Sequence, residues 1–355
     1  MAETRPSVLV IGAGILGASA AFALQRAGAQ VKIVDDGAEV ATAASFGWIN
    51  ASFHHDTAHF RLRAAGLDAW ERLGRTLDLP VAWQGTLCWE ETGAAFDAQR
   101  DQLAALGYAV EEVDAAAFAA FEPHVAAPPE RALKFKQEGS VDSMAATQTL
   151  LTGALAAGAR RLRGLRVEGL VEQGGRIMGI RTQAGALHAD HVLIAAGTGS
   201  AVLMAQAGAP LPMVRRPALM LRTRPLRPVL KHILVSEFGE LRQLADGALL
   251  MPAAVDHQGD TAETVSDDLE GTAAHVMARL RALLPDLPLA WEELTLAHRP
   301  VPQDGLPVIG AVREGLHVVC MHSGITLGAL AGEMVALEML EGVTNSSAAL
   351  LAPYR

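Results

Sequence analysis

The sequence predicts an α/β fold with two domains, one of which is assembled from segments far apart in the chain. An apolar strand followed by a glycine-rich turn and a helix occupies residues 7–26. A second apolar strand ending in glycines occupies residues 191–199, and a last buried strand occupies residues 318–321. The segments between them have the pattern of a large mixed or antiparallel β-sheet. We therefore expect the chain to leave the first domain twice and return to it twice.

Residues 7–36 have the pattern of a Rossmann-type dinucleotide site. Residues 8–11 are apolar and rich in β-branched side chains, as a strand buried on both faces requires. In the GAGILG motif that follows, Gly12 permits a tight turn, Gly14 lets a pyrophosphate approach the backbone, and Gly17 lets the helix pack closely. An ordinary glycine-rich turn is the alternative interpretation, and the motif alone does not separate FAD from NAD.

A carboxylate stands where the motif expects one. The strand at residues 31–34 ends at Asp35, close to the ~20-residue spacing at which an acidic side chain accepts hydrogen bonds from a ribose. Asp36 is the adjacent carboxylate. The start of the helix supplies free N–H groups and a partial positive charge for the pyrophosphate.

The bulk composition fits a globular enzyme and excludes several partners. The chain has 355 residues, of which 50% are hydrophobic and 19% charged, with a net charge of −10. That charge repels nucleic acid and anionic membranes. The N-terminus lacks a signal-peptide pattern, and the first apolar run is too short for a bilayer. We expect a cytoplasmic protein with neither an integral membrane segment nor a metal site.

Two further observations concern individual residue types. The two cysteines, Cys88 and Cys320, lie far apart, which argues for a reducing compartment and against a disulfide scaffold. Four arginines within residues 160–166 are the densest basic group, and we interpret them as a solvated face.

The remaining elements and the domain boundaries follow from periodicity and from glycine and proline positions. Helices are expected at residues 57–77, 94–106, 111–121, 141–157, 268–284 and 325–340. Strands are expected at residues 80–89, 164–170, 176–182, 191–196, 294–302 and 318–321, with several more within 219–251, and a linker at 210–217. Residues 1–80, 145–215 and 297–355 are assigned to the nucleotide domain, and residues 81–144 and 216–296 to the substrate domain.

Four motifs resemble those of the D-amino acid oxidase superfamily of FAD-dependent amine oxidoreductases, which includes glycine oxidase, sarcosine oxidase and the D-amino acid dehydrogenases. The motifs are GAGILG at 12–17 with Asp35, ATAASFG at 41–47, ADHVLIAAG at 189–197, and RPVPQDGLPVIG at 299–310 followed by HSGITL at 322–327. The last is similar to the family pattern R-P-x-T-x-D-G-x-P-x-I-G, although Pro302-Gln303 replaces its Thr-Pro.

The resemblance implies non-covalent FAD as the cofactor. The cysteine that carries covalent flavin in monomeric sarcosine oxidases would fall near Ala297, which has no thiol to form such a bond. It also implies hydride transfer from the α-carbon of an amino acid to flavin N5, giving an imine that hydrolyses to an oxo acid. The residues it assigns to FAD binding are Gly12, Gly14, Ile15, Leu16, Gly17, Asp35, Asp36, Thr42, Ala43, Ala44, Ser45, Gly47, Val167, Ala196, Gly197, Ser323, Gly324, Ile325, Thr326 and Leu327.

Three residues are candidates for binding the substrate or for lining the space between the substrate and the flavin. By position, Arg299 matches the family arginine that binds the substrate carboxylate, and a guanidinium fork suits that role. His322 aligns near a polar residue close to the flavin. Trp48 either walls the flavin ring or fills the core. The tyrosines, Tyr108 and Tyr354, cannot be matched to the carboxylate-binding pair of some D-amino acid oxidases.

The expected substrate is a small amine bearing a carboxylate: a D-amino acid, glycine, an N-alkyl amino acid or an opine-like amine. Two alternatives remain open. One is an FAD-dependent 2-hydroxy acid or polyol dehydrogenase, and the other is an FAD-containing subunit of a larger complex. The sequence leaves undecided the substrate's side chain and stereochemistry, the electron acceptor, and whether the protein is a homo-oligomer or has a partner subunit.

Overall fold

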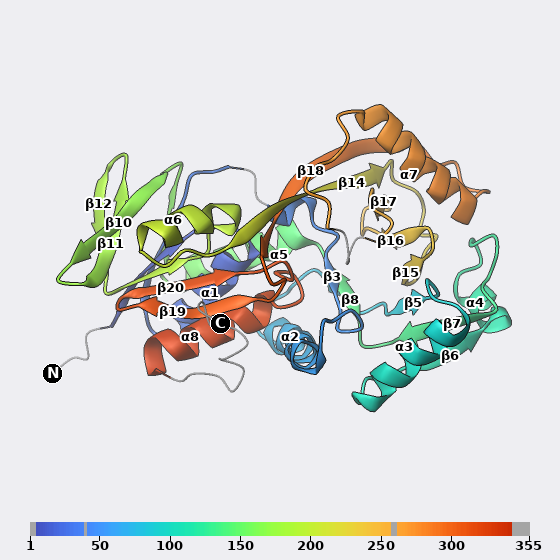
Figure 1. The fold of residues 1–355 in the computed structure, drawn as a ribbon, viewed down its shortest axis with the longest axis horizontal. Helices are drawn as coiled ribbons and strands as arrows, with labels where there is room; N and C mark the ends of the chain where they lie inside the picture. The colour runs from blue at the N-terminus through green and yellow to red at the C-terminus, as the bar shows by residue number, and fades with distance from the viewer. Residues whose placement is uncertain (1–4, 39–40, 257–260, 343–355) are drawn as a thin grey trace.

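A mostly parallel sheet forms the centre of one lobe, on the left in Figure 1. The computed structural model describes residues 5–38, 41–256 and 261–342. In spatial order, the described strands of this parallel sheet are β19 (Val308–Arg313), β20 (Leu316–Cys320), β13 (His191–Ile194), β1 (Ser7–Ile11), β2 (Gln30–Asp35) and β9 (Arg160–Arg163). Neighbours run parallel except β19 and β20, which are antiparallel. Strands from the start, middle and end of the chain thus meet in one sheet, which confirms the predicted α/β class.

Helices cover one face of the parallel sheet, and a small antiparallel sheet covers the other. The helices are α1 (Ile15–Arg26), α5 (Ser143–Ala156) and α8 (Gly328–Glu341). The opposite layer contains β10 (Val167–Gln173), β11 (Arg176–Thr182), β12 (Gly185–His188) and α6 (Ser200–Gln206). Along β1, Val8 and Val10 pack with the helices, whereas Leu9 and Ile11 pack against β11 and α6. The strand is therefore buried on both faces, as its apolar run predicts.

The other lobe is built on a larger, mainly antiparallel sheet, and its long strands β14 and β18 reach toward the first lobe (Figure 1). Among the described residues, the order in this large sheet is β18 (Trp291–Pro302), β14 (Met213–Thr223), β17 (Leu249–Pro252), β16 (Gly239–Gln243), β15 (Ile233–Ser236), β5 (Thr86–Cys88), β7 (Arg131–Phe135) and β6 (Glu111–Asp114). β15 and β5 pair in parallel, and the other neighbours are antiparallel.

The two faces of the large sheet pack against different parts of the molecule. The outer face carries Leu221 and Leu234 and packs on α7 (Leu269–Leu283). The inner face carries Met220 and Val235, which belong to the same hydrophobic core as helices α1 and α8. The inner face therefore looks toward the lobe of the parallel sheet, called below the nucleotide lobe after its predicted function.

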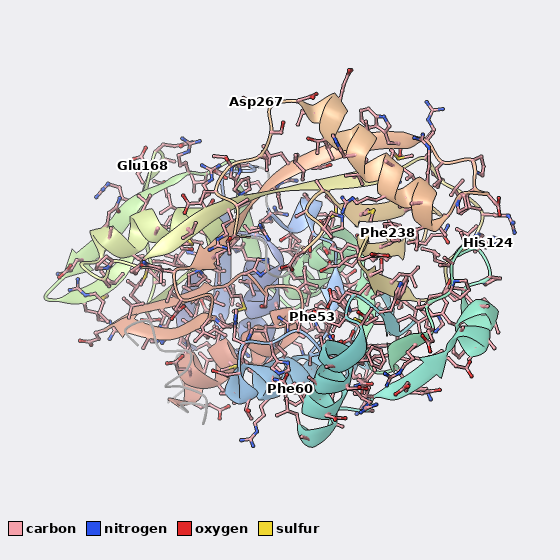
Figure 2. All side chains as sticks on the ribbon, turned by 45° about the vertical axis from the view of Figure 1, so that its right-hand side comes forward. Phe53, Phe60, His124, Glu168, Phe238 and Asp267 are labelled. Atoms are coloured by element: carbon pink, nitrogen blue, oxygen red, sulfur yellow. The ribbon has the colours of Figure 1, made fainter. Side chains whose placement is uncertain are left out.

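Smaller elements complete the fold. They are η1 (Ala41–Ala44), β3 (Trp48–Ile49), α2 (Thr57–Gly74), β4 (Val81–Ala82), α3 (Gly93–Ala105), α4 (Ala115–Phe121), β8 (Gly139–Val141) and η2 (Gly197–Gly199). Near α2, the ring centroid of Phe60 lies 5.5 Å from that of Tyr108, and Phe53 lies 5.3 Å from Trp48 (Figure 2 labels both phenylalanines). Within the part of the chain that is described, no helix has the length and apolarity to cross a membrane.

Three predicted elements are wrong in detail. Residues 80–89 form two short strands in different sheets, β4 and β5, because Gly85 turns the chain between them with a φ of 75°. Residues 111–121 begin as strand β6 and become helical only after Asp114, whose carboxylate caps α4 by accepting from the Ala117 N–H. The expected linker at 210–217 contains the start of β14, because pairing with β18 extends that strand to Met213.

The arginines within residues 160–166 are not simply a solvated face. Three of the four arginines lie on β9, the edge strand beside β2. Arg161 pairs with Asp35 at the end of β2, and its side chain is only 19% exposed. The domain boundaries given above stay a prediction, and the segment 297–355 extends beyond the last described residue, Gly342.

Gly66 marks a close approach between α2 and the chain at residue 326. A Cβ at Gly66 would lie 2.7 Å from the Thr326 carbonyl oxygen, whereas one at Gly74 of the same helix would meet nothing within 4 Å. We predict that Gly66→Ala lowers the free energy of unfolding by about 1–3 kcal/mol through overpacking. Gly74→Ala should leave it unchanged or raise it by up to about 1 kcal/mol. Denaturant unfolding of the two variants checks this, and equal stability would contradict the close contact.

Candidate active site

The carboxyl ends of β1, β2 and β13 converge on a glycine-rich turn. Gly12 leaves β1 with a φ of 107°, and its N–H donates to the Val34 carbonyl at 2.9 Å. A Cβ at residue 12 would lie 2.3 Å from the carbonyl oxygen of Ala195, just after β13. Both the backbone angle and the crowding therefore require glycine at this turn.

The start of α1 fits the pyrophosphate of FAD. Its N-cap is Gly14, which brings no side chain to accept hydrogen bonds from the first turn. The Ile15 N–H donates to Thr42 Oγ1 at 3.3 Å, which holds η1 beside the helix start. A Cβ at Gly17 would lie 2.1 Å from the Gly12 carbonyl oxygen, so the helix packs directly on the turn. An anion can approach the backbone N–H groups at the start of this helix, where the helix dipole also gives a partial positive charge. The start of α1 is therefore a suitable anion site.

Asp35 ends β2 and is held by Arg161. The Arg161 Nε donates to Oδ2 at 2.8 Å and Nη2 to Oδ1 at 3.2 Å, while the Gly37 N–H donates to Oδ1 at 3.2 Å. A carboxylate offers about four acceptor positions, so the Asp35 carboxylate retains capacity for a ribose hydroxyl. Asp36 lies nearer the surface, 3.8 Å from Arg166. The sequence did not single out Arg161, because its role depends on pairing between distant strands.

A second glycine-rich turn borders the same region. Gly197 begins η2 directly after β13, and Ala196 is its N-cap. β18 contacts both η1 and η2. Since η1 lies beside the start of α1, the strand that carries Arg299 passes next to both parts of the predicted FAD site.

The turn at residues 323–327 precedes α8 and is anchored from α2 and β3. Trp70 on α2 donates from Nε1 to the Ile325 carbonyl at 2.8 Å. Thr326 Oγ1 donates to the Trp48 carbonyl at 3.2 Å. A Cβ at Gly324 would lie 3.7 Å from the side chain of Leu16, so this turn rests against the start of α1. The structure therefore brings the N-terminal and C-terminal FAD motifs together.

A buried arginine that sequence reasoning missed also supports this turn. Arg63 on α2 is 5% exposed. It donates from Nη1 to Ser323 Oγ at 3.0 Å, from Nε to the Asn50 carbonyl at 3.1 Å, and from Nη2 to Asn50 Oδ1. Burial lowers the pKa of Arg63 to about 10, against which the Glu138 carboxylate favours the charged form. Arg63 is thus a cation at neutral pH.

A fully buried carboxylate organises the adjacent segment. Glu138, between β7 and β8, accepts from Tyr108 Oη at 2.8 Å and from Trp48 Nε1 at 3.1 Å. It also accepts from the N–H groups of Ala51 at 3.3 Å and Ser52 at 3.1 Å. Burial raises the pKa of Glu138, and its hydrogen bonds oppose that shift. Glu138 therefore connects the large-sheet lobe to the chain that leads into α2.

Other predicted residues occupy various positions. Trp48 is 5% exposed, and its ring meets Phe46 and Phe53 edge-on, so it lies in the core. His322 is half-buried at the start of the turn described above, and Val167 begins β10. Tyr354 lies outside the described residues. The roles assigned to these side chains stay predictions.

Arg299 lies on the inner face of β18 and is 8% exposed. Its Nη2 donates to the Pro217 carbonyl of β14 at 3.3 Å. In the ladder it pairs with Arg216. A buried guanidinium on the side facing the nucleotide lobe is suitably placed to bind an anionic group between the lobes.

The convergent glycine-rich turns are suited to a dinucleotide cofactor. A family model described as FAD dependent oxidoreductase matches residues 7–337. The chain therefore belongs to this DAO family, whose cofactor is FAD, and Gly12, Gly14, Gly17 and the turn at 323–327 are the residues that would hold it.

Named relatives resemble the chain in sequence, and a solved structure resembles it in fold. The chain is 27% identical over 333 residues to a glycine oxidase from Pseudomonas putida, covering 89% of this chain and 88% of that protein. It is 27% identical over 209 residues to the bifunctional protein ThiO/ThiG from Trichormus variabilis, covering 57% of this chain but 31% of that protein. The crystal structure of L-proline dehydrogenase from P. horikoshii has the same fold, with a TM-score of 0.88, 19% identity and coverage of 99% and 97% of the two chains.

We predict that Asp35→Ala weakens FAD binding. Losing a hydrogen bond from a ribose hydroxyl to a charged acceptor costs about 1.5–3 kcal/mol, so the dissociation constant should rise roughly ten- to a hundredfold. Arg161→Gln is the comparison variant, because it removes the ion pair but keeps the carboxylate, to which the Gly37 N–H still donates; its FAD affinity should fall less than that of Asp35→Ala. Titration of FAD into the two apoproteins measures both. If Asp35→Ala keeps its affinity, Asp35 serves only as the partner of Arg161.

Proposed function

We propose that this protein oxidises the C–N bond of a small amino acid or related amine and gives an imine, which water hydrolyses to the oxo acid and ammonia or an amine. Bound FAD supplies the hydride acceptor for this reaction. The substrates considered are D-amino acids, glycine, N-alkyl amino acids and opine-like amines. The observation that carries the proposal is the buried Arg299 guanidinium on the inner face of β18, a strand that contacts both η1 and η2.

The chain's own residues have a positioning role in this proposal. Arg299 would hold the substrate carboxylate through a bidentate pair, because its planar fork matches two carboxylate oxygens. Burial of the guanidinium, which is 8% exposed, would strengthen that pair by limiting its contact with water. Hydride transfer from a free amine does not require a strong general base. Orientation of the α-carbon therefore accounts for most of what the protein must contribute.

The relatives support the amine substrate class. A relative that aligns with 89% of this chain is named for glycine oxidation. Because the chain covers 31% of the ThiO/ThiG protein, the activity and assembly of that larger protein are not transferred to this one.

Anaerobic flavin reduction tests the proposal directly. The holoenzyme is mixed with D-amino acids, glycine, N-methyl amino acids and opine-like secondary amines, and separately with 2-hydroxy acids and polyols. We predict that at least one amine bleaches the flavin absorbance and that the hydroxy compounds do not. Bleaching by hydroxy acids alone would support the alcohol-oxidising alternative. Reduction that requires a second, co-purifying chain would show that the protein is a subunit of a larger enzyme.

Arg299 is the residue on which substrate binding should depend most. Truncating one side of a buried charge pair costs about 3–5 kcal/mol. Arg299→Ala should therefore lower kcat/KM for carboxylate-bearing amines by on the order of a hundredfold to several thousandfold. Arg299→Lys should restore only part of the activity, because an ammonium cannot reproduce the planar fork.

The FAD content of each Arg299 variant is the control. It should equal that of the unmodified protein, since the glycine-rich turns hold the cofactor. Full activity of Arg299→Ala on carboxylate substrates would show that the arginine is structural, and so would loss of FAD without a specific effect on substrate binding.

A further inference from the structure

We propose that Arg216, directly opposite Arg299 in the β14–β18 ladder, forms a second anion subsite, and that the substrates are amines carrying two carboxylates. The second carboxylate would be on the amino acid side chain or on a substituent of the nitrogen. This inference rests on the proposed function, because it takes Arg299 as the ligand of the first carboxylate.

The register of the ladder places both guanidinium groups on one face. β14 and β18 are antiparallel, and Arg216 is the partner of Arg299. Directly opposite residues of an antiparallel pair project to the same side, with Cβ atoms about 4.5–5.5 Å apart. Met220 shares this face of β14 and packs in the core that includes Trp48. Both arginines therefore project toward the nucleotide-binding lobe.

Both side chains enter the protein interior. Arg299 is 8% exposed, and the Nε atom of the half-buried Arg216 is fully covered by protein. Like charges directly opposite each other destabilise a sheet. The chain nevertheless places two cations opposite each other, although its net charge is −10. Two adjacent forks are suited to two carboxylates of one ligand, each bound bidentately.

The neighbouring ladder residues have small side chains. The next partners on the inner face are Ala218 and Ala297, whose side chains are single methyl groups. Arg242, another buried arginine, lies beside β8: it donates to Ser140 Oγ at 3.1 Å and to the Val141 carbonyl at 3.4 Å. At the pair formed by Arg216 and Arg299, two guanidinium groups adjoin small side chains.

Arg215 provides a matched control for Arg216. It is the preceding residue of β14, so its side chain projects to the opposite face. It is exposed, and its Nη2 lies 3.4 Å from Nδ1 of His298. A change at Arg215 removes the same charge from the same strand without altering the inner face.

Binding of inert ligands to the holoenzyme tests the subsite independently of turnover. Oxydiacetate carries two carboxylates and methoxyacetate carries one, and neither has an oxidisable amine. Perturbation of the flavin absorbance reports their binding. We expect oxydiacetate to bind about a hundredfold more tightly than methoxyacetate, and Arg216→Gln to abolish most of that difference. Arg215→Gln should leave both affinities within about threefold of the unmodified protein.

Kinetics identify which arm of the substrate carries the second carboxylate. Iminodiacetate compared with sarcosine tests a substituent on nitrogen, and D-glutamate compared with D-alanine tests a side chain. For the preferred dicarboxylate, Arg216→Gln should lower kcat/KM about a hundredfold, mostly through KM. For the monocarboxylate of the same pair, the change should stay within about threefold, and Arg216→Lys should recover part of the loss.

The outcomes separate this inference from the proposed function. Equal binding of oxydiacetate and methoxyacetate, or equal weakening of both by Arg216→Gln, would overturn the second subsite, even if a monocarboxylate amine reduces the flavin. Arg216-dependent binding of oxydiacetate without reduction by any amine would instead contradict amine oxidation and leave the dicarboxylate subsite standing.

Discussion

The candidate site depends on two charged side chains that are buried in the interior, Glu138 and Arg63. Glu138 comes from the large-sheet lobe, yet it accepts hydrogen bonds from Trp48 and from the backbone at Ser52, which leads into α2. Arg63, on α2 and electrostatically coupled to Glu138, holds Ser323 in turn. An unpaired buried charge costs several kcal/mol. The hydrogen bonds to Glu138 and the electrostatic interaction between Glu138 and Arg63 therefore support the contact between Arg63 and Ser323. A few polar groups therefore fix the C-terminal FAD turn relative to the large sheet.

The second determinant is the pairing of β14 with β18. The ladder runs without a register shift from Met213 and Pro302 to Arg222 and Glu293, so the backbone at Arg299 is set by many hydrogen-bonded neighbours. Sites on strands are positioned more accurately than sites on loops. β18 also contacts η1 and η2 of the nucleotide lobe. The same strand thus belongs to the large sheet and borders the predicted FAD site.

Local patterns were sufficient to predict the strand–turn–helix unit formed by β1 and α1, whereas long-range pairing was not visible in the sequence. Gly12 and Gly17 are required by contacts within a short strand–turn–helix unit, so their spacing alone was informative. Arg63 offered only a weak signal, a charge at helical spacing from apolar Phe60 and Trp70. The roles of Glu138 and Arg161 were not recognisable from the sequence. Their hydrogen-bond partners lie in distant segments of the chain, which come close to them only in the folded protein.

The distribution of charge links ligand binding to stability. The molecule as a whole is negative, but Arg63, Arg242 and Arg299 are buried between its lobes. Burial lowers the pKa of both Arg63 and Arg242 to about 10, so both stay charged at neutral pH. Desolvated cations attract anions more strongly than surface cations do. Repulsion between the negative surface and an approaching carboxylate is screened beyond about 8 Å at physiological ionic strength. Attraction by the nearby arginines therefore dominates once a carboxylate enters the site. A ligand that binds only the native state stabilises it, so a carboxylate held by Arg299 would raise the free energy of unfolding.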